Sequence, residues 1–161
     1  MSQEINKIYY PNGSIKSKHY FLNKKLHRED ESAIIWYYEN GNIEREEYWI
    51  NGKRHRENEP AWIHYDLNGI IYQERYCLNG KQHREDEPAA IYYRSNGNIK
   101  EESYYLNGKQ HREIGPALIL YHEDGTIDQE FYYLNGEYIT DEFQILVIQG
   151  LGMENKKIYE I

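Results

Sequence analysis

"AIIWYYENGNIEREEYWING", residues 33–52, contains two Asn-Gly pairs, each at the end of a short run of β-prone residues. Asn-Gly tolerates the positive φ angles of tight hairpin turns, so each pair predicts a reversal between antiparallel strands. Side chains alternate between the two faces of a strand, which puts Ala33, Ile35 and Tyr37 on one face. The stretch therefore predicts one hairpin followed directly by the turn of the next.

The loop at Asn40-Gly41 decides which side chains the return strand adds to that face. A two-residue loop adds Glu46, Tyr48 and Ile50, whereas a three-residue loop with a bulge adds Ile43 instead and flips the strand. We favour the two-residue loop, because almost every recurring side chain then lies on the same face.

The hairpin pattern recurs along the chain. His-Arg-Glu begins at residues 27, 55, 83 and 111, so successive copies are 28 residues apart. One series of turns falls at Asn12-Gly13, Asn40-Gly41, Asn68-Gly69, Asn96-Gly97 and Asp124-Gly125. A second series falls at Asn23-Lys24, Asn51-Gly52, Asn79-Gly80, Asn107-Gly108 and Asn135-Gly136. Two turn series with one period predict a tandem array with two strands in each repeat.

Side chains between the turns return at the same repeat position. The recurring residues include Tyr9, Tyr37, Tyr65, Tyr93 and Tyr121; Tyr20, Tyr48, Tyr76, Tyr104 and Tyr132; Ile35, Ile63, Ile91 and Ile119; Ala33, Ala61, Ala89 and Ala117; and Glu46, Glu74, Glu102 and Glu130. The chain has 18 tyrosines but only 39% apolar residues. Tyrosine suits half-buried surfaces, since its hydroxyl needs water or a partner, so the composition favours a thin architecture.

The stretch HREDEP, residues 83–88, and its copies close each repeat. We expect the stretch to sit within a strand that bulges or bends at Pro60, Pro88 and Pro116, because proline cannot donate a hydrogen bond to a strand ladder. The alanine that follows each proline is small enough for close packing.

The end of the chain departs from the pattern after Gly136. Thr140 suits a helix cap, and Phe143, Leu146 and Val147 follow helical spacing, although a short strand is the competing interpretation. We predict a single repeat domain over residues 1–161, with about four and a half repeats over 8–138 and a short helical cap over 139–161.

Charge and composition bear on location and partners. The formal charge of −8 repels polyphosphate backbones and anionic membrane surfaces. Cys77 is the single cysteine, the first ten residues do not resemble a secretion signal, and no apolar run approaches the roughly 18 residues that span a bilayer. We expect a cytoplasmic protein with no nucleic-acid or membrane partner. Nucleic acid stacking on aromatic side chains remains an alternative, for which the candidate rings are Trp36, Trp49, Trp62, Tyr105 and Tyr133.

The unit "YYLNGKQHREIGPALILYHEDGTI", residues 104–127, resembles a divergent MORN repeat. The turn and the histidine of that family match Asn107, Gly108 and His111, whereas Arg112 stands where the family has glycine. The resemblance covers about residues 8–138, with a repeat longer than usual, as in proteins of giant DNA viruses and some bacteria. It implies an all-β fold: an elongated single-layer antiparallel meander of stacked β-hairpins. Such repeats serve as protein-binding scaffolds, dimerisation modules and lipid-proximal anchors.

The repeated His-Arg-Glu invites a chemical interpretation. Histidines of successive repeats are separated by two strands, about 9.5 Å, so they do not easily share a zinc ion, whose ligands lie about 2.0 to 2.3 Å from the metal. A metal site within one repeat, at His83, Glu85 and Asp86, is the alternative. Acid–base catalysis needs two ionisable groups whose environments give them different pKa values. Four copies of His-Arg-Glu place the same groups in the same environment four times, which argues against an active site.

We therefore predict no catalytic, cofactor-binding or metal-binding residues and no cofactor. We expect the glutamate column to form ion pairs with the arginines or a solvated ladder, and each histidine to bond the backbone of its bend or a carboxylate. The predicted structural motif comprises His27, Arg28, Glu29, His55, Arg56, Glu57, His83, Arg84, Glu85, His111, Arg112 and Glu113.

A single-layer sheet leaves an aromatic face with no second layer behind it, and exposed apolar patches usually mark an interface. The predicted interaction face comprises Tyr37, Tyr48, Tyr65, Tyr76, Tyr93, Tyr104, Tyr121 and Tyr132. We expect a non-catalytic scaffold that contacts a protein partner or a second copy of itself, for example as a homodimer. An antitoxin-like or immunity-like protein that binds one partner enzyme is the first alternative, and an enzyme of unknown type is the second.

Overall fold

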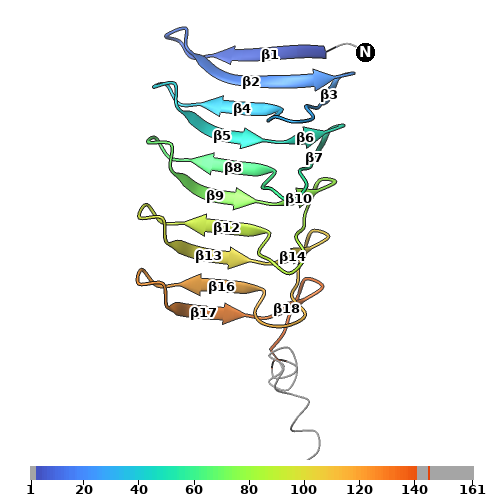
Figure 1. Ribbon diagram of the computed structural model, residues 1–161, viewed down its shortest axis with the longest axis vertical. Helices are drawn as coiled ribbons and strands as arrows, with labels where there is room; N and C mark the ends of the chain where they lie inside the picture. The colour runs from blue at the N-terminus through green and yellow to red at the C-terminus, as the bar shows by residue number, and fades with distance from the viewer. Residues whose placement is uncertain (1–2, 141–144, 146–161) are drawn as a thin grey trace, which may run out of the picture.

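The main sheet is a single antiparallel layer. The computed structural model describes residues 3–140 and residue 145, and its main strands follow the order β1-β2-β4-β5-β8-β9-β12-β13-β16-β17. These strands lie one above another along the long axis of the molecule (Figure 1). Their bounds are β1 (Gln3–Tyr9), β2 (Ile15–Leu22), β4 (Ile34–Tyr37), β5 (Ile43–Glu47), β8 (Trp62–Tyr65), β9 (Ile71–Arg75), β12 (Ala90–Tyr93), β13 (Ile99–Ser103), β16 (Leu118–Tyr121) and β17 (Ile127–Phe131). The predicted all-β meander of consecutive hairpins is confirmed.

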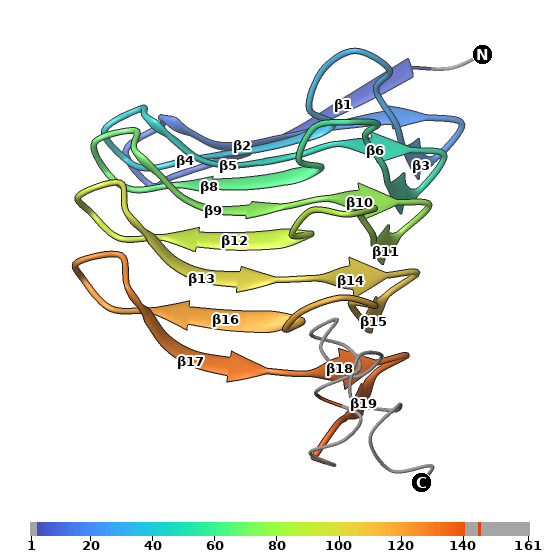
Figure 2. The same cartoon turned by 60° about the horizontal axis from the view of Figure 1, so that its bottom comes forward.

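Small hairpins form a column beside the main sheet (Figure 2). They are β6 (Trp49–Ile50) with β7 (Lys53–Arg54), β10 (Cys77–Leu78) with β11 (Lys81–Gln82), β14 (Tyr105–Leu106) with β15 (Lys109–Gln110), and β18 (Tyr133–Leu134) with β19 (Glu137–Tyr138); in the first repeat β3 (Lys25–Leu26) pairs with β2. Asn79 and Gly80 both have positive φ, 52° and 86°, and Leu78 pairs with Lys81. This is the two-residue turn that Asn-Gly favours.

The turn at Asn40-Gly41 is longer than we predicted. Tyr38 donates its N–H to Asn42 O at 2.9 Å, and the ladder shifts register so that Tyr37 pairs with Ile43 while Ile35 pairs with Glu46. Paired residues share a face, so the bulge puts Ile43 and Glu46 on the same face as Ile35. The preferred two-residue loop is therefore wrong here, and neither of the two geometries that we considered describes the return strand completely.

The His-Arg-Glu stretch is a loop and not part of a strand, which corrects the prediction. It connects β7 to β8, and its equivalents connect the later repeats in the same way. Asn58 and Asp86 have positive φ, 60° and 58°, which a strand does not allow, and Pro60 has no N–H for a ladder. Regular pairing resumes at Ala61, whose N–H donates to Arg75 O at 2.8 Å.

The tightest packing lies at the alanine that begins each repeat. Ala33, Ala61, Ala89 and Ala117 are all 0% exposed, and the next inward side chains, Ile63, Ile91 and Ile119, are 7–8% exposed. Tyr48 N–H donates to Ala61 O at 2.9 Å, which draws the strand end of one repeat against the start of the next. Close packing at these alanines is as the sequence predicted.

Most of the predicted C-terminal cap, residues 139–161, lies outside the described residues. The N–H of Ile139 donates to Tyr132 O at 2.8 Å, so residue 139 still follows the pattern of the repeats. No helix in the described part of the chain is long and apolar enough to cross a membrane.

Two adjacent alanines provide a test of this packing. Ala89→Leu should lower the free energy of unfolding by about 2 kcal/mol, because the site is filled from both neighbouring strands. Ala90 is also buried, at 3% exposed, but the same repeat position holds Ile34, Trp62 and Leu118 elsewhere. Ala90→Leu should therefore cost much less. Urea denaturation of both variants checks the pair, and equal losses would contradict the assignment.

Candidate functional site

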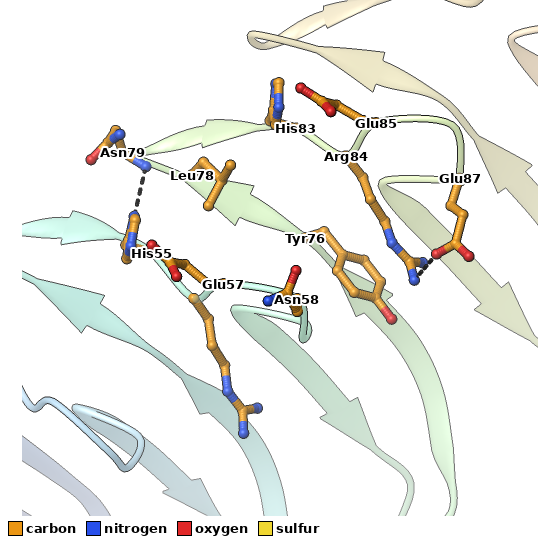
Figure 3. A pocket seen from close by; sticks show the side chains of 11 residues that line it. His55, Glu57, Asn58, Tyr76, Leu78, Asn79, His83, Arg84, Glu85 and Glu87 are labelled. Carbon is orange, nitrogen blue, oxygen red and sulfur yellow. Dashed lines mark hydrogen bonds and ion pairs between the residues drawn. The ribbon is translucent and has the colours of Figure 1, made fainter.

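Each motif histidine links two repeats. The Nδ1 atoms of His27, His55, His83 and His111 accept hydrogen bonds from the backbone N–H groups of Asn51, Asn79, Asn107 and Asn135, at 3.1, 3.2, 3.1 and 3.0 Å. Each asparagine begins the small-hairpin turn of the following repeat, as the dashed line from His55 to Asn79 shows (Figure 3). The sequence predicts a bond to the backbone of the histidine's own bend or to a carboxylate. The backbone group that His55 bonds is instead 24 residues further along, while His27 Nε2 also lies 3.8 Å from a carboxylate oxygen of Glu29.

Each motif arginine connects its own loop to a tyrosine of the main sheet. The guanidinium carbons of Arg56, Arg84 and Arg112 lie 3.8 Å from the ring centroids of Tyr48, Tyr76 and Tyr104 respectively. Arg84 Nη1 also donates to Pro88 O at 3.4 Å, and Arg84 forms an ion pair with Glu87 (Figure 3). Stacking on a ring and pairing with a carboxylate are both typical of arginine, and together they use the guanidinium within the repeat.

The hollows beside these loops recur with the repeat. One is lined by Tyr76, Leu78, Arg84 and Glu85, and the next by the equivalent residues Tyr104, Leu106, Arg112 and Glu113. Hollows of the same composition do not provide the differing environments that separate an acid from a base. Within residues 3–140 and at residue 145, no group of three or more His, Cys, Asp and Glu side chains is placed to hold a metal ion.

The glutamate column binds tyrosines and not the motif arginines, which corrects the sequence expectation. Tyr65, Tyr93 and Tyr121 donate their hydroxyls to Glu46, Glu74 and Glu102, at 2.8, 2.7 and 2.6 Å. Burial, together with the hydrogen bond to the carboxylate, raises the pKa of each of these tyrosines, so the hydroxyl keeps its proton and donates. Each bond again joins one repeat to the next.

The predicted tyrosine interaction face is largely occupied by contacts within the chain. All eight tyrosines are half-buried or buried, and Tyr104 and Tyr132 are only 9% and 7% exposed. The residues that recur in every repeat thus share one face of the main sheet, which we call the constant face. It comprises the repeat positions of Ala61, Ile63, Tyr65, Ile71, Glu74 and Tyr76, together with the loops that cover them.

The opposite face carries side chains that change from repeat to repeat. We call it the variable face; its cross-strand pairs are Ile34–Glu47, Trp36–Arg45, Trp62–Arg75, His64–Gln73, Ala90–Ser103, Tyr92–Glu101, Leu118–Phe131 and Leu120–Gln129. One position of the repeat, for example, holds Trp36, His64, Tyr92 and Leu120. Sequence reasoning named Trp36, Trp49 and Trp62 as candidate rings for nucleic acid but did not place them on one face, because it followed the residues that recur; the departures from the period were the signal.

A tryptophan–arginine cluster occupies the middle of the variable face; it comprises Trp36, Arg45, Glu47, Trp49, Arg54, Trp62 and Arg75. It holds all three tryptophans of the chain. Glu47 is 3% exposed, and its carboxylate accepts from Trp49 Nε1 at 3.1 Å and Arg54 Nε at 2.9 Å and forms an ion pair with Arg45 at 3.0 Å. The cluster is therefore organised around one buried carboxylate, which holds two guanidinium groups.

Several buried polar atoms on this face have no hydrogen-bond partner among the described residues, including Ser17 Oγ and His19 Nε2 on β2, which pairs with β4. Trp62 Nε1 and His64 Nε2 are two more of these atoms. Burial and the nearby Arg45 lower the pKa of His64 to about 4, so its ring is neutral at pH 7, and its Nδ1 is bonded to Tyr72 OH at 2.8 Å. Buried polar atoms are usually paired, so the unpaired atoms of this face are exceptions to the pattern seen elsewhere in proteins.

Comparison with known families identifies the frame of the array. A model of the MORN repeat variant matches residues 5–29, 33–51 and 89–109. The chain is a MORN-like repeat protein. No curated protein and no solved structure matches it.

The MORN-variant matches cover three of the repeats; between and beyond them, residues 30–32, 52–88 and 110–161 are not matched, and Trp62 and Arg75 lie in the interval 52–88. Proteins built of MORN repeats are generally non-enzymatic, and the family suggests a scaffold or binding role. The matched segments also hold Trp36, Arg45 and Glu47 of the variable face, so the matches cover part of that face as well as the repeating frame.

His83→Ala tests the link between repeats. Losing the acceptor for the N–H of Asn107 should lower the free energy of unfolding by about 1 kcal/mol and speed hydrogen exchange at that amide. His122→Ala is the control, since His122 is exposed and makes no such link. Urea denaturation and amide exchange measure both effects. An unchanged exchange rate at Asn107 in His83→Ala would show that the bond contributes nothing.

Proposed function

We propose that this MORN-like protein is a non-catalytic scaffold that binds another protein through its variable face. The observation that carries the proposal is the gathering of all three tryptophans with Arg45, Arg54 and Arg75 on one face of the sheet. Tryptophan, tyrosine and arginine are the residues most enriched at the energetic centres of protein interfaces. The constant face supplies the rigid frame, because its side chains bond one repeat to the next.

The entropy lost on binding also supports the variable face as the binding surface. A binding surface loses less entropy on association when its side chains are already held in place. Arg54 and Arg45 are held by Glu47, and Arg75 Nη2 donates to Tyr92 OH at 2.8 Å. The cluster is therefore ordered before a partner arrives. An antitoxin-like protein that binds one enzyme would be a special case of this function.

Site-specific photo-crosslinking tests which face binds. Benzoylphenylalanine replaces His64 on the variable face in one variant and Glu85 on a constant-face loop in its matched control. We expect protein crosslinks in cells from position 64 and few from position 85, with circular dichroism showing both variants folded. Crosslinks from position 85 alone would move the interface to the His-Arg-Glu loops, and none from either position would contradict a protein-binding scaffold.

Self-association is a second candidate, favoured by the two end strands. In the described part of the chain, β1 and β17 each have an unpaired edge, and Ile5, Ile8 and Ile127 are 54%, 46% and 52% exposed. Inside the array Glu102 pairs with Ile119 across the junction of two repeats. Continuing that register into a second copy would place Lys7 opposite Glu130. Open edges of this kind are templates for strand pairing between chains.

A charge swap tests the head-to-tail pairing. Lys7→Glu should weaken association at least about tenfold, because two carboxylates would face each other, and the double variant Lys7→Glu/Glu130→Lys should restore it. Light scattering after size-exclusion chromatography, over a range of concentrations, measures the mass. A wild-type protein that stays monomeric at every concentration, or a double variant that fails to recover, would rule out this pairing.

A further inference from the structure

One hollow on the variable face is lined by cations without a carboxylate. It has a volume of about 330 Å³, and Arg54, Trp62, Arg75 and Lys81 are among its lining residues. Two glycines, Gly80 and Gly108, also line it and add no side chain to fill it. The three hollows on the side of the His-Arg-Glu loops each contain at least three carboxylates. The hollow beside Trp62 is therefore suited to an anion, although the chain as a whole carries a charge of −8.

The cations of this hollow are only partly neutralised by the protein itself. Glu47 is the carboxylate next to them, and its oxygens are engaged by Trp49, Arg54 and Arg45. In the described part of the chain, neither Arg75 nor Lys81 forms an ion pair. A partly buried guanidinium without a carboxylate favours an anionic ligand that brings one.

Both arginines of this hollow lie against the ring of Trp62. The guanidinium carbons of Arg54 and Arg75 lie 4.7 and 4.3 Å from the ring centroid of Trp62. Arg75 is also held by Tyr92 OH. With the amide of Gln73 oriented to satisfy its neighbours, the amide oxygen accepts from Arg75 Nε at 2.6 Å and from Arg75 Nη2 at 2.8 Å. The guanidinium is therefore fixed in position, and its Nη1 is left to donate to a carboxylate. The buried Trp62 Nε1–H, which has no partner in residues 3–140 or 145, is a further donor at the same place.

We infer that this hollow receives an aspartate or glutamate side chain from an acidic segment of the protein partner. The inference rests on the proposed protein-binding function and names the chemistry of the partner. Arg75 and Lys81 contact the carboxylate, Trp62 packs against the rest of the segment, and the neighbouring aromatic residues of the tryptophan–arginine cluster extend the contact. A protein segment fits better than a nucleic acid, because the overall negative charge repels a polyphosphate chain, while one or two carboxylates need only the local cations.

Peptide binding tests the inference directly. The probe is a fluorescein-labelled hexaglutamate peptide, and fluorescence anisotropy at low salt measures its dissociation constant with the full-length protein. Arg75→Gln and Lys81→Gln should each weaken binding at least about fivefold, and added salt should weaken it further. Lys53→Gln and Lys109→Gln are matched controls, because both lysines occupy the position of Lys81 in neighbouring repeats but do not line the hollow. We expect the controls to bind like the wild type.

The outcomes separate this inference from the proposed function. Failure of the wild-type protein to bind hexaglutamate, or equal losses in Lys81→Gln and the two controls, would overturn the acidic-segment inference. Tighter binding of an oligothymidylate than of hexaglutamate would assign the hollow to nucleic acid instead. Either result, combined with protein crosslinks from position 64, would leave the protein-binding scaffold standing. Lys81→Gln keeps the test decisive if Arg75→Gln fails to fold, since the Lys81 side chain is exposed.

Discussion

The whole array depends on the close approach of neighbouring strands at one alanine in each repeat. At Ala61 the backbone both donates to Arg75 O and accepts from Tyr48 N–H, while the methyl group is completely buried. A larger side chain would push these strands apart. The hydrogen bonds that join the repeats, from the motif histidines and from tyrosine hydroxyls such as that of Tyr65, would then lose their geometry. The small residue therefore allows the more elaborate contacts of the constant face to form.

The division of the molecule into two faces follows from that geometry. Side chains of a strand alternate between faces, so a residue that must recur to hold the repeats together leaves its neighbour in the sequence free to change. Ile63 recurs with a period of 28 residues, whereas adjacent Trp62 and His64 do not. One face can therefore hold the array together while the other acquires chemistry of its own. Repeat architectures in general suit binding for this reason, since stability comes from contacts between neighbouring units.

Much of the fold could be predicted from the sequence, because Asn-Gly turns and a fixed period are local signals. The hairpins, their order and the buried alanines follow from residues such as Asn79, Gly80 and Ala89. The bulge that puts both Ile43 and Glu46 on one face could not be predicted. The same turn residues are compatible with more than one loop length, and each loop length gives the return strand a different register. The site was harder to predict. The partner of His55 is a backbone N–H, which cannot be inferred from residue identity, and the repeat position of Arg75 holds Glu47, Ser103 and Phe131 elsewhere, so no recurrence marks it.

The direction of the strands determines how the molecule responds to force. The main strands lie across the long axis (Figure 1), so the hydrogen bonds between them point along that axis. Tension applied at the two ends would open these bonds a few at a time, from the ends inward, instead of shearing all of them together. Each repeat that opens would release 28 residues, roughly 95 Å of extended chain. The protein would therefore lengthen in even steps at low force, as an extensible tether does.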